Sequence, residues 1–323
     1  MKAINNFWLP RLFSNEYIEG TLAFKGYHGA LLSQSIYWSF VAAAIIASVL
    51  ISFFRRIIKE NYAGTKKIMF LPKVLFWRIF GILSLAGIVA RCIIVILTNY
   101  QFKFEILPLH FCRLMVIFLA VAMIINRIDL IKYFGFLSVF GAISALFVPS
   151  MGEYSGADNF WFWDYLLLHI YSFVVPFLLF AISKFEYTFK TTVVTITFFV
   201  VMCLLMFGIN FALDTYAKDP TWKSNYWYLG LNENNDLYQK FGKVVAWPTH
   251  ILLFIFLGIV LTILFIAVWA LFDKIYIIKE EGKIKAYVTR SDFWVKYKES
   301  MKQFFKRDKN RKKRWICYYC KLD

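Results

Sequence analysis

The sequence predicts an all-α, polytopic membrane protein with seven transmembrane helices, and three observations indicate this class. Of the 323 residues, 60% are hydrophobic and 20% are aromatic. The mean hydropathy of +0.58 is higher than a water-soluble domain sustains. Finally, the chain contains seven apolar runs, each long enough to cross a hydrocarbon core of about 30 Å as a helix.

Polar segments separate the seven apolar runs from one another. The runs are Ser33–Phe54, Val74–Leu97, Ile106–Ile125, Ile131–Val148, Phe160–Ile182, Thr191–Leu213 and Trp247–Phe272. The first 20 residues lack the pattern of a cleavable signal, so we expect the first run to act as the insertion signal. We therefore divide the chain into an N-terminal segment (1–32), a transmembrane domain (33–272) and a C-terminal tail (273–323).

The basic residues predict which side of the membrane each segment occupies. The C-terminal tail contains 16 Lys and Arg residues, and the first loop carries the cluster Arg55, Arg56 and Lys59 directly after the first run. Cytoplasmic segments are enriched in Lys and Arg. The sequence thus predicts an N-terminus outside and a C-terminus in the cytoplasm, in a multi-pass protein of the cell membrane.

The tail also has the pattern of a surface helix. Its apolar residues recur at helical spacing, with lysines between them: Trp294, Tyr297, Met301 and Phe304. The basic run Lys306–Arg314 follows, and we expect it to bind anionic lipid of the inner leaflet. Nucleic acid is the weaker alternative, because no known nucleic-acid-binding motif accompanies the charge.

Polar side chains within the apolar runs are the strongest functional signal, because ionisable groups at membrane depth are costly and usually face a cavity or a partner. With the predicted topology, nearly all of them lie toward the outside. They are Arg91 in the second run; His110, Cys112 and Arg113 in the third; Asp164, Tyr165, His169 and Ser172 in the fifth; and Asn210 in the sixth. Cationic groups outnumber the single acidic group in this set, Asp164, so we expect an outward-facing pocket that prefers an anion.

Helical geometry restricts how the side chains of the third run can cooperate. Pro108 suits the first turn of a helix. At about 100° per residue, His110 and Arg113 share a face, whereas Cys112 is about 160° from His110. A base for Cys112 must therefore come from another helix, with His169 the best placed by depth; otherwise Cys112 is a packing residue.

Two further helix faces carry small or polar residues. In the fifth run Tyr165, His169, Ser172 and Pro176 form one stripe, which predicts a surface that faces the other helices. In the second run Ser84, Gly87 and Arg91 share a face, where small residues allow a neighbouring helix to approach closely.

The motif Leu107–Cys112, LPLHFC, resembles the LPLHLC hallmark of the YwaF-type bacterial integral membrane family. Further segments are similar to that family's pattern in the same order: Phe140–Ser150, His169 followed by Pro176, Gly208–Asn210, Ser224–Tyr226 with Tyr228 and Leu229, and Trp247 with Pro248. The family's second span commonly carries a glutamate, where this chain has Arg91 nearby. The resemblance implies seven helices in the plasma membrane of a bacterium.

The resemblance also implies a chemistry, because distant eukaryotic relatives of the family are cysteine-dependent phospholipid acyltransferases. It makes Cys112 the nucleophile and His110 or His169 the base. Asn210 or Asn225 would then donate to the oxyanion, and Arg91 and Arg113, with Asp164 and Tyr165, would bind a phospholipid substrate.

Two other functions fit the same residues. The protein could be a non-catalytic transporter or receptor for an anionic small molecule, or a structural membrane protein whose tail recruits partners. The sequence has no phosphate-binding loop, zinc-protease motif or nucleophile elbow, which disfavours nucleotide hydrolysis and the common hydrolase mechanisms. We expect neither a cofactor nor a metal. Cys317 and Cys320 have a metal-like spacing, but a single such pair is a weak signal. The oligomeric state is not predicted.

Overall fold

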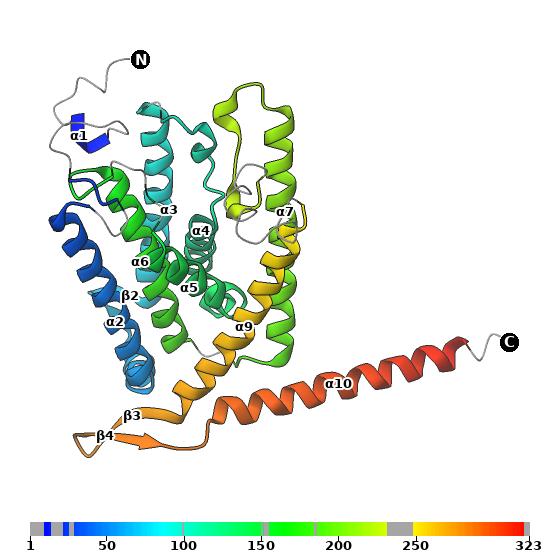
Figure 1. The fold of residues 1–323 in the computed structure, drawn as a ribbon. Coiled ribbons are helices and arrows are strands. Elements are labelled where there is room, and N and C mark those ends of the chain that lie inside the picture. Colours follow the sequence, from blue (N-terminus) through cyan, green and yellow to red (C-terminus); the bar gives the residue numbers. More distant parts are fainter. Residues whose placement is uncertain are drawn as a thin grey trace.

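The structure, a computed structural model, describes residues 10–13, 22–25, 29–98, 100–149, 151, 155–183, 186–230 and 248–319, with side chains through Lys306 in the last segment. Seven helices in these ranges, two of them extended at their start by a 3-10 turn, are long and apolar enough to cross a membrane (Figure 1). They are α2 (Leu31–Gly64), α3 (Lys73–Leu97), α4 (Phe111–Ile124), α5 (Ile131–Phe147), α6 (Phe160–Ile182), α7 (Phe189–Tyr216) and α9 (His250–Lys274). The predicted all-α membrane class is confirmed, whereas the orientation of the termini stays a prediction.

The loops divide between the two ends of the bundle. The N-terminal end carries the short helix α1 (Pro10–Phe13), the 3-10 turn η1 (Lys103–Ile106), and the turns η3 (Pro220–Trp222) and η4 (Tyr226–Tyr228). The C-terminal end carries the strand pair β1 (Lys67–Ile68) and β2 (Leu71–Pro72), the turn η2 (Ile128–Leu130), and the described residues that follow α9.

The core lies between the central helices α4, α5 and α6, which contact each other and are flanked by the others. Met115, Leu119 and Leu179 are fully buried there. The outer helices instead expose large apolar side chains such as Leu83, Leu204 and Leu252, which suits a surface in contact with lipid. In a bilayer the hydrophobic effect does not drive helices together, because lipid tails are as apolar as the side chains. Close van der Waals packing between complementary helix surfaces must do so.

One close approach between helices falls at a different residue from the one expected. A Cβ atom at Gly81 of α3 would lie 2.7 Å from the backbone oxygen of Ala120 on α4. A Cβ at Gly87 would have nothing within 4 Å. The small residue that brings α3 onto α4 is therefore Gly81, and Ser84 instead hydrogen-bonds to Tyr171 of α6, 2.8 Å between the hydroxyl oxygens.

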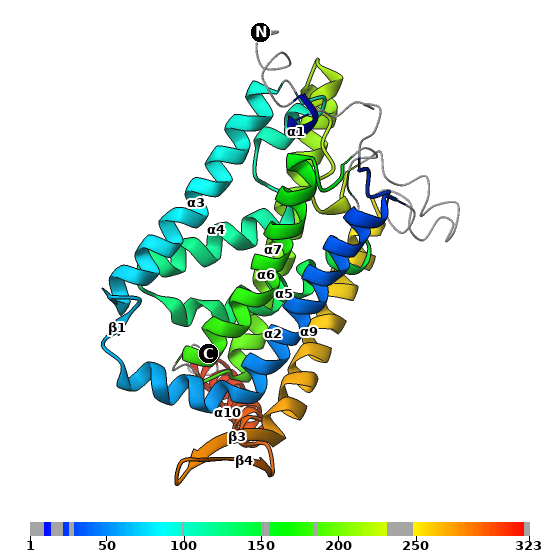
Figure 2. The same ribbon diagram turned by 90° about the vertical axis from the view of Figure 1, so that its left-hand side faces the viewer.

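Helix α2 continues beyond its apolar run. Figure 2 shows its last turns bending to run across the C-terminal end of the bundle. Within α2 the hydroxyl of Ser52 donates to the carbonyl of Ser48 at 2.8 Å, a bond of the kind that competes with helical backbone bonds and favours bending.

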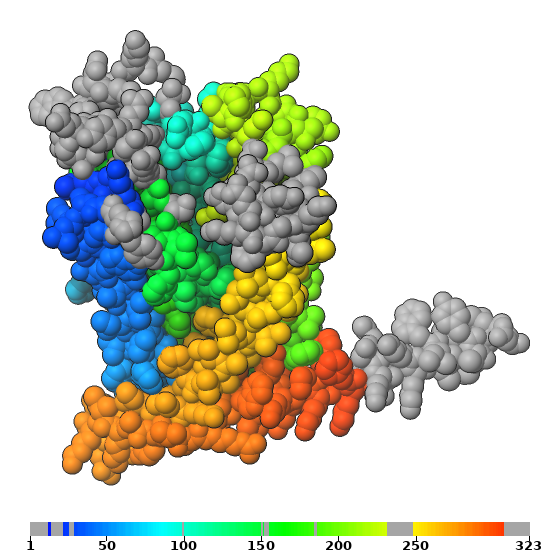
Figure 3. Space-filling model, in the orientation of Figure 1, coloured from blue at the N-terminus to red at the C-terminus, as the bar shows by residue number. Residues whose placement is uncertain are grey.

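The tail begins with a hairpin that the sequence interpretation did not include. Strands β3 (Ile275–Glu280) and β4 (Lys283–Val288) pair antiparallel, and both turn residues, Glu281 and Gly282, have positive φ. Helix α10 (Asp292–Tyr319) follows. Figure 3 shows the hairpin and the start of α10 lying across this end of the bundle.

The apolar stripe of α10 contacts protein in its first turns. Tyr297 is buried, its hydroxyl lies 2.8 Å from that of Thr192 on α7, and Phe304 packs against Phe189 with 5.2 Å between ring centroids. Lipid binding by the tail stays a prediction, and the side chains of the basic run after Lys306, Cys317, Cys320 and the residue Trp247 lie outside the described part of the chain.

Candidate functional site

Five ionisable side chains from three helices and one turn meet at the N-terminal end of the bundle. They are Arg91 of α3, Glu105 of η1, His110 and Arg113 at the start of α4, and Asp164 of α6. We call this set the charge cluster. The side chain of His110 is 32% exposed, whereas that of Arg91 is 5% exposed. The cluster is therefore largely buried, and His110 is its most exposed member.

Glu105 is the centre of the charge cluster. Its Oε1 lies 2.8 Å from His110 Nε2, and its Oε2 accepts from Arg113 Nη1 at 2.6 Å. Arg91 also donates to Oε2 and to the backbone oxygen of Glu105. His110 and Arg113 thus contact the same acidic residue, but not through a shared helical face: the helix begins at Phe111, so Pro108 is not in its first turn and His110 is the N-cap with an extended backbone.

Asp164 closes the charge cluster from α6. Its Oδ2 lies 3.5 Å from Arg91 Nε and 3.4 Å from Arg113 Nη2. With Glu105 included, two carboxylates face two guanidinium groups. The expected excess of positive charge, which counted Asp164 as the only acidic group, is therefore wrong for this cluster, because both arginines are already bound by carboxylates.

Aromatic rings enclose the charge cluster. The guanidinium of Arg91 lies over the ring of Trp161, 5.7 Å from its centroid. Tyr100 also packs against Trp161, with 4.5 Å between the ring centroids. Burial, followed by the charge of Glu105, raises the pKa of Tyr100 to about 12, so this phenol stays neutral. The rings keep water from the charges and strengthen their interactions.

The loop between α7 and α9 covers the LPLHFC segment. Tyr226 is fully buried, with its ring 5.2 Å from that of His110, and its hydroxyl donates to the carbonyl of Phe104. Trp227 adopts a left-handed backbone conformation, φ 61°, and its indole N–H donates to the carbonyl of Leu109 at 2.9 Å. Two segments far apart in the sequence are therefore locked together.

Asn210 of α7 fixes this loop. Its side-chain Nδ2 donates to the carbonyl of Tyr226 at 2.8 Å, and its Oδ1 accepts from Ser224 Oγ at 2.8 Å and from the Tyr226 N–H at 2.9 Å. Asn225 works within the loop, where its Oδ1 accepts from the N–H of Gly230 at 2.9 Å. Both asparagines therefore use their side chains to hold the loop between α7 and α9.

The motif Leu107–Cys112 also contacts the motif Phe140–Ser150, and the contact is made by Phe111. A Cβ atom at Gly141 of α5 would lie 2.3 Å from the ring of Phe111. The opposite contact is Trp227, whose ring centroid is 4.6 Å from that of Phe111. Phe111 therefore anchors the first turn of α4 between α5 and the loop.

Cys112 lies beside Phe111 in the first turn of α4 and is buried. Helix α6 packs against it at this level, because Ser172 Oγ donates to the carbonyl of Cys112 at 3.5 Å. His169 lies on the same face of α6 as Ser172, one turn earlier. His169 Nδ1 is 2.6 Å from the carbonyl of Tyr165, and no hydrogen bond between described atoms joins His169 to Cys112.

The predicted polar stripe of α6 faces the other helices. His169, Ser172 and Pro176 are buried, and Tyr165 donates from its hydroxyl to the carbonyl of Ala145 on α5 at 2.7 Å. Asp164, the preceding residue, points to the charge cluster. Tyr165 and Asp164 therefore serve different neighbours, although His169 lies within electrostatic range of Asp164, Arg113 and His110.

The start of α4 has free backbone donors. Its N-cap residue, His110, supplies no side-chain cap, and among the described residues no acceptor takes the N–H groups of residues 111–113. Helix N-termini with open N–H groups bind anions. No group of three His, Cys, Asp or Glu side chains in the described ranges is arranged to hold a metal.

Glu105 is the main residue that sequence reasoning missed. It lies one position before the third apolar run, outside the segments in which polar residues predict a site. The signal was an acidic residue directly before a motif with a histidine and an arginine, in a chain whose second span carries a buried arginine. Tyr226 belongs to the Ser224–Tyr226 motif, which by itself predicts no contact with His110.

Comparison with known proteins gives the family of the chain. No curated protein and no solved structure matches it. The sequence model of the TMEM164 family matches residues 31–269, a range that includes the charge cluster, Cys112, His169 and the membrane helices almost to the end of α9. Because this match covers well over half of the sequence, the chain belongs to the TMEM164 family of membrane proteins.

Proposed function

We propose that the protein transfers acyl groups between membrane phospholipids, with Cys112 as the nucleophile and His169 as the base. The observation that carries the proposal is the position of Cys112 in the uncapped first turn of α4, against the polar face of α6. The family resemblance of the LPLHFC motif, which implies cysteine-dependent acyl transfer, supports the same assignment. The substrate class is a phospholipid ester reached from the end of the bundle that carries the charge cluster.

The hydrogen bond of His169 supports its role as base. A carbonyl oxygen can only accept, so the contact with Tyr165 requires the proton of the neutral imidazole to be on Nδ1. Nε2 is then the unprotonated nitrogen, able to take a proton from the Cys112 thiol. Catalytic hydrogen bonds often tighten only when substrate binds, so the thiol and Nε2 would meet by side-chain rotation.

The open N–H groups of residues 111–113 supply an oxyanion site. Asn210, the donor expected from sequence, already uses its amide to hold Tyr226. The first turn of α4 instead presents backbone donors next to the nucleophile, at the positive end of the helix dipole. Asn225 would support the loop rather than the reaction.

The reaction has two steps. His169 removes the thiol proton, the Cys112 thiolate attacks the ester carbonyl carbon of a phospholipid, and the carbon–oxygen bond to glycerol breaks as His169 protonates the departing lysophospholipid. The resulting thioester is then attacked by the hydroxyl of an acceptor lysophospholipid, again deprotonated by His169, which regenerates the thiol. Water as the acceptor gives hydrolysis.

In this proposal the charge cluster positions the nucleophile. Glu105 and Asp164 hold Arg91 and Arg113, and Arg113 follows Cys112 directly in α4, so the network fixes the turn that carries the thiol. His110 is bound to Glu105 and is therefore assigned to this network rather than to the base. An anion transporter or receptor draws less support, because both arginines are occupied by carboxylates.

The test uses protein in nanodiscs that contain phosphatidylcholine with one labelled acyl chain and an unlabelled lysophospholipid acceptor. We expect Cys112→Ser to reduce label transfer to background and His169→Ala to reduce it by a factor of about 100 or more. Wild-type protein quenched during turnover should carry a hydroxylamine-labile acyl group on Cys112, detected by mass spectrometry.

The matched control is Cys203→Ser, which changes the fully buried cysteine of α7 and should retain activity. Equal transfer by the wild type and Cys112→Ser would refute the proposal. Uptake of a labelled anion into proteoliposomes that is lost in Arg113→Gln but unchanged in Cys112→Ser would favour the transporter instead.

A further inference from the structure

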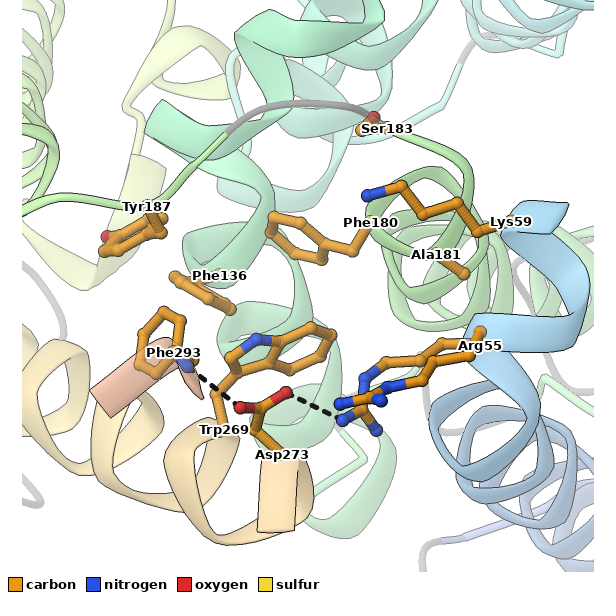
Figure 4. Close-up of a pocket in the computed structure, with 11 residues that line it drawn as sticks. Arg55, Lys59, Phe136, Phe180, Ala181, Ser183, Tyr187, Trp269, Asp273 and Phe293 are labelled. Atoms are coloured by element: carbon orange, nitrogen blue, oxygen red, sulfur yellow. Dashed lines mark hydrogen bonds and ion pairs between the residues drawn. The ribbon is translucent and has the colours of Figure 1, made fainter. Parts of the chain in front are cut away.

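A second polar site lies at the opposite, C-terminal end of the bundle, where a cavity of about 240 Å³ opens between α2, α5, α6, α9 and the start of α10 (Figure 4). At about 30 Å³ per water molecule, this volume equals that of roughly eight waters. The cavity is separate from the charge cluster and is not used by the reaction proposed for Cys112.

The bent end of α2 forms one side of this cavity. Arg55, Arg56 and Lys59 lie on it, one turn or less apart, directly after the apolar run. The last turns of α2 run across the end of the bundle (Figure 2), so we expect the side chains that directly follow the apolar run to lie where the hydrocarbon region ends and headgroups begin. A cavity at this level is placed to receive a headgroup.

The guanidinium of Arg55 is bound by groups of the protein itself. Its Nη2 lies 2.8 Å from Asp273 Oδ1, a pair drawn in Figure 4, and its Nη1 also donates to the carbonyl of Phe272 at 3.2 Å. Asp273 uses its other oxygen to accept from Ser291 Oγ at 3.0 Å and from the Phe293 N–H at 2.9 Å. This pair ties α2, α9 and α10 together and leaves no charge for a ligand.

The other two cations are not neutralised in this way. Arg56 stacks on the ring of Tyr276 at 3.3 Å, and its Nη2 is 3.8 Å from Asp292, whose side chain is 78% exposed. Lys59 has no hydrogen bond or ion pair to any described residue. The carboxylate that acts on it at longer range, Glu186, is bound to Lys296 at 2.6 Å.

Aromatic side chains form the rest of the wall. Phe136, Phe180 and Trp269 pack together, and Figure 4 shows the Lys59 ammonium extending over the cavity toward Phe180. Burial raises the pKa of Tyr187 to about 12, so its phenol adds no negative charge. Lys59 is exposed and Arg56 is partly buried, and the apolar wall beside them lowers the dielectric on one side, which strengthens their attraction for an anion relative to cations surrounded by water.

We propose that this cavity binds a phosphate-ester anion of a phospholipid headgroup, with Lys59 and Arg56 as its ligands and the Arg55–Asp273 pair as its frame. Basic pockets between membrane helices are known to take anionic headgroups. The predicted topology puts this end in the cytoplasm, where the leaflet is rich in anionic lipid. The same chemistry would accept a soluble phosphate ester, and the experiment separates the two sources.

The experiment measures the thermal midpoint of the full chain in phosphatidylcholine nanodiscs with increasing fractions of phosphatidylglycerol. A ligand that binds only the folded protein raises the midpoint in proportion to its occupancy. We expect stabilisation of the wild type, and an apparent affinity about fivefold weaker in Lys59→Gln. A second arm adds glycerol phosphate or inorganic phosphate to nanodiscs of phosphatidylcholine alone.

The matched control is Lys66→Gln, which removes an equal charge at the same end of the bundle from a residue that does not line the cavity. Its affinity should equal that of the wild type. Stabilisation in the second arm that is lost in Lys59→Gln would support a phosphate site and assign it to soluble esters. Equal loss in Lys66→Gln and Lys59→Gln, or no loss in either, would overturn the proposal.

Discussion

The two ends of the bundle carry arginines in opposite electrostatic situations. At the N-terminal end Arg91 and Arg113 each contact both Glu105 and Asp164, and aromatic rings close over them. At the C-terminal end one arginine, Arg55, is paired in the same way, while neighbouring cations face an open cavity. The difference lies in the number of carboxylates. The charge cluster has two carboxylates for its two guanidinium groups, whereas the cavity at the other end is lined by one carboxylate, Asp273, and three cationic side chains.

This difference shows that an intramembrane arginine does not by itself indicate an anion site. A buried guanidinium must be paired, since an isolated buried charge costs several kcal/mol. Where carboxylates do this, the arginine organises the backbone, as Arg113 does beside Cys112. Where they do not, the uncompensated charge is available to a ligand. The next experiments test this distinction.

The largest effect is expected for Glu105→Gln. The change leaves two buried guanidinium groups with one carboxylate between them, and the loss of one partner from a buried ion pair costs about 3–5 kcal/mol. We expect a correspondingly lower free energy of unfolding in detergent or nanodiscs, measured by thermal or denaturant unfolding. The additional change Arg113→Met should recover part of the loss by removing an unpaired charge.

The control for this experiment is Glu186→Gln, in which an exposed carboxylate loses its contact with Lys296. Exposed ion pairs contribute about 0–1 kcal/mol. If Glu105→Gln were no more destabilising than Glu186→Gln, the charge cluster would not hold this end together, and the contrast between the two ends would fail.

A smaller effect is expected for Asn210→Ala. Removal of the amide leaves the carbonyl and N–H of Tyr226 without their partner in a buried setting, at a cost of about 1–3 kcal/mol. The loss should be local, so hydrogen exchange should rise at residues 224–230, which cover His110. Acyl transfer should fall as the first turn of α4 loses its cover.

A hydrogen bond at the C-terminal end of the bundle provides the control for Asn210→Ala. Ser291→Ala removes a hydrogen bond to Asp273 and should raise exchange only near the start of α10. A variant that raised exchange at both ends would contradict the independence of the two regions.

Hydrophobic length predicted the membrane helices well, because a span is a local property of the chain. The run Phe160–Ile182 coincides with α6, and the predicted start of the second span is one residue from that of α3. The errors have physical causes. Helix α2 extends to Gly64 because its last turns leave the apolar region but stay helical, and α4 begins at Phe111 because Pro108 and the η1 turn precede it.

The charge balance of the site could not be read from the sequence in the same way. His110 and Arg113 are three residues apart, but their shared contact with Glu105 depends on a turn that leaves His110 outside α4, and the contact of Arg113 with Asp164 depends on how α6 packs against α4. The hairpin after α9 has a local signal in the sequence, the Glu281–Gly282 turn between two short strands, whereas the predicted surface helix of the tail concerns only later residues, from Trp294 onward.

The smallest effect concerns Asp219, an exposed acid near the charge cluster. Hydrogen bonds from Lys103 and then Thr221 lower the pKa of Asp219 from 3.8 to about 2. A depressed carboxyl pKa contributes stability that is fully present above the ordinary pKa and disappears as the pH falls through the lowered one. The tie between η1 and the loop after α7 should therefore weaken between about pH 4 and pH 2.

Pepsin, which cleaves throughout this range, provides the measurement. At pH 4 the wild type should be cleaved within residues 217–223 more slowly than Asp219→Asn, and at pH 2 the two rates should converge. A difference that persisted at pH 2 would mean that the carboxylate charge does not hold the loop. Because this pair is exposed, salt should also reduce the difference at pH 4, whereas the destabilisation by Glu105→Gln, which arises in a buried cluster, should depend little on salt.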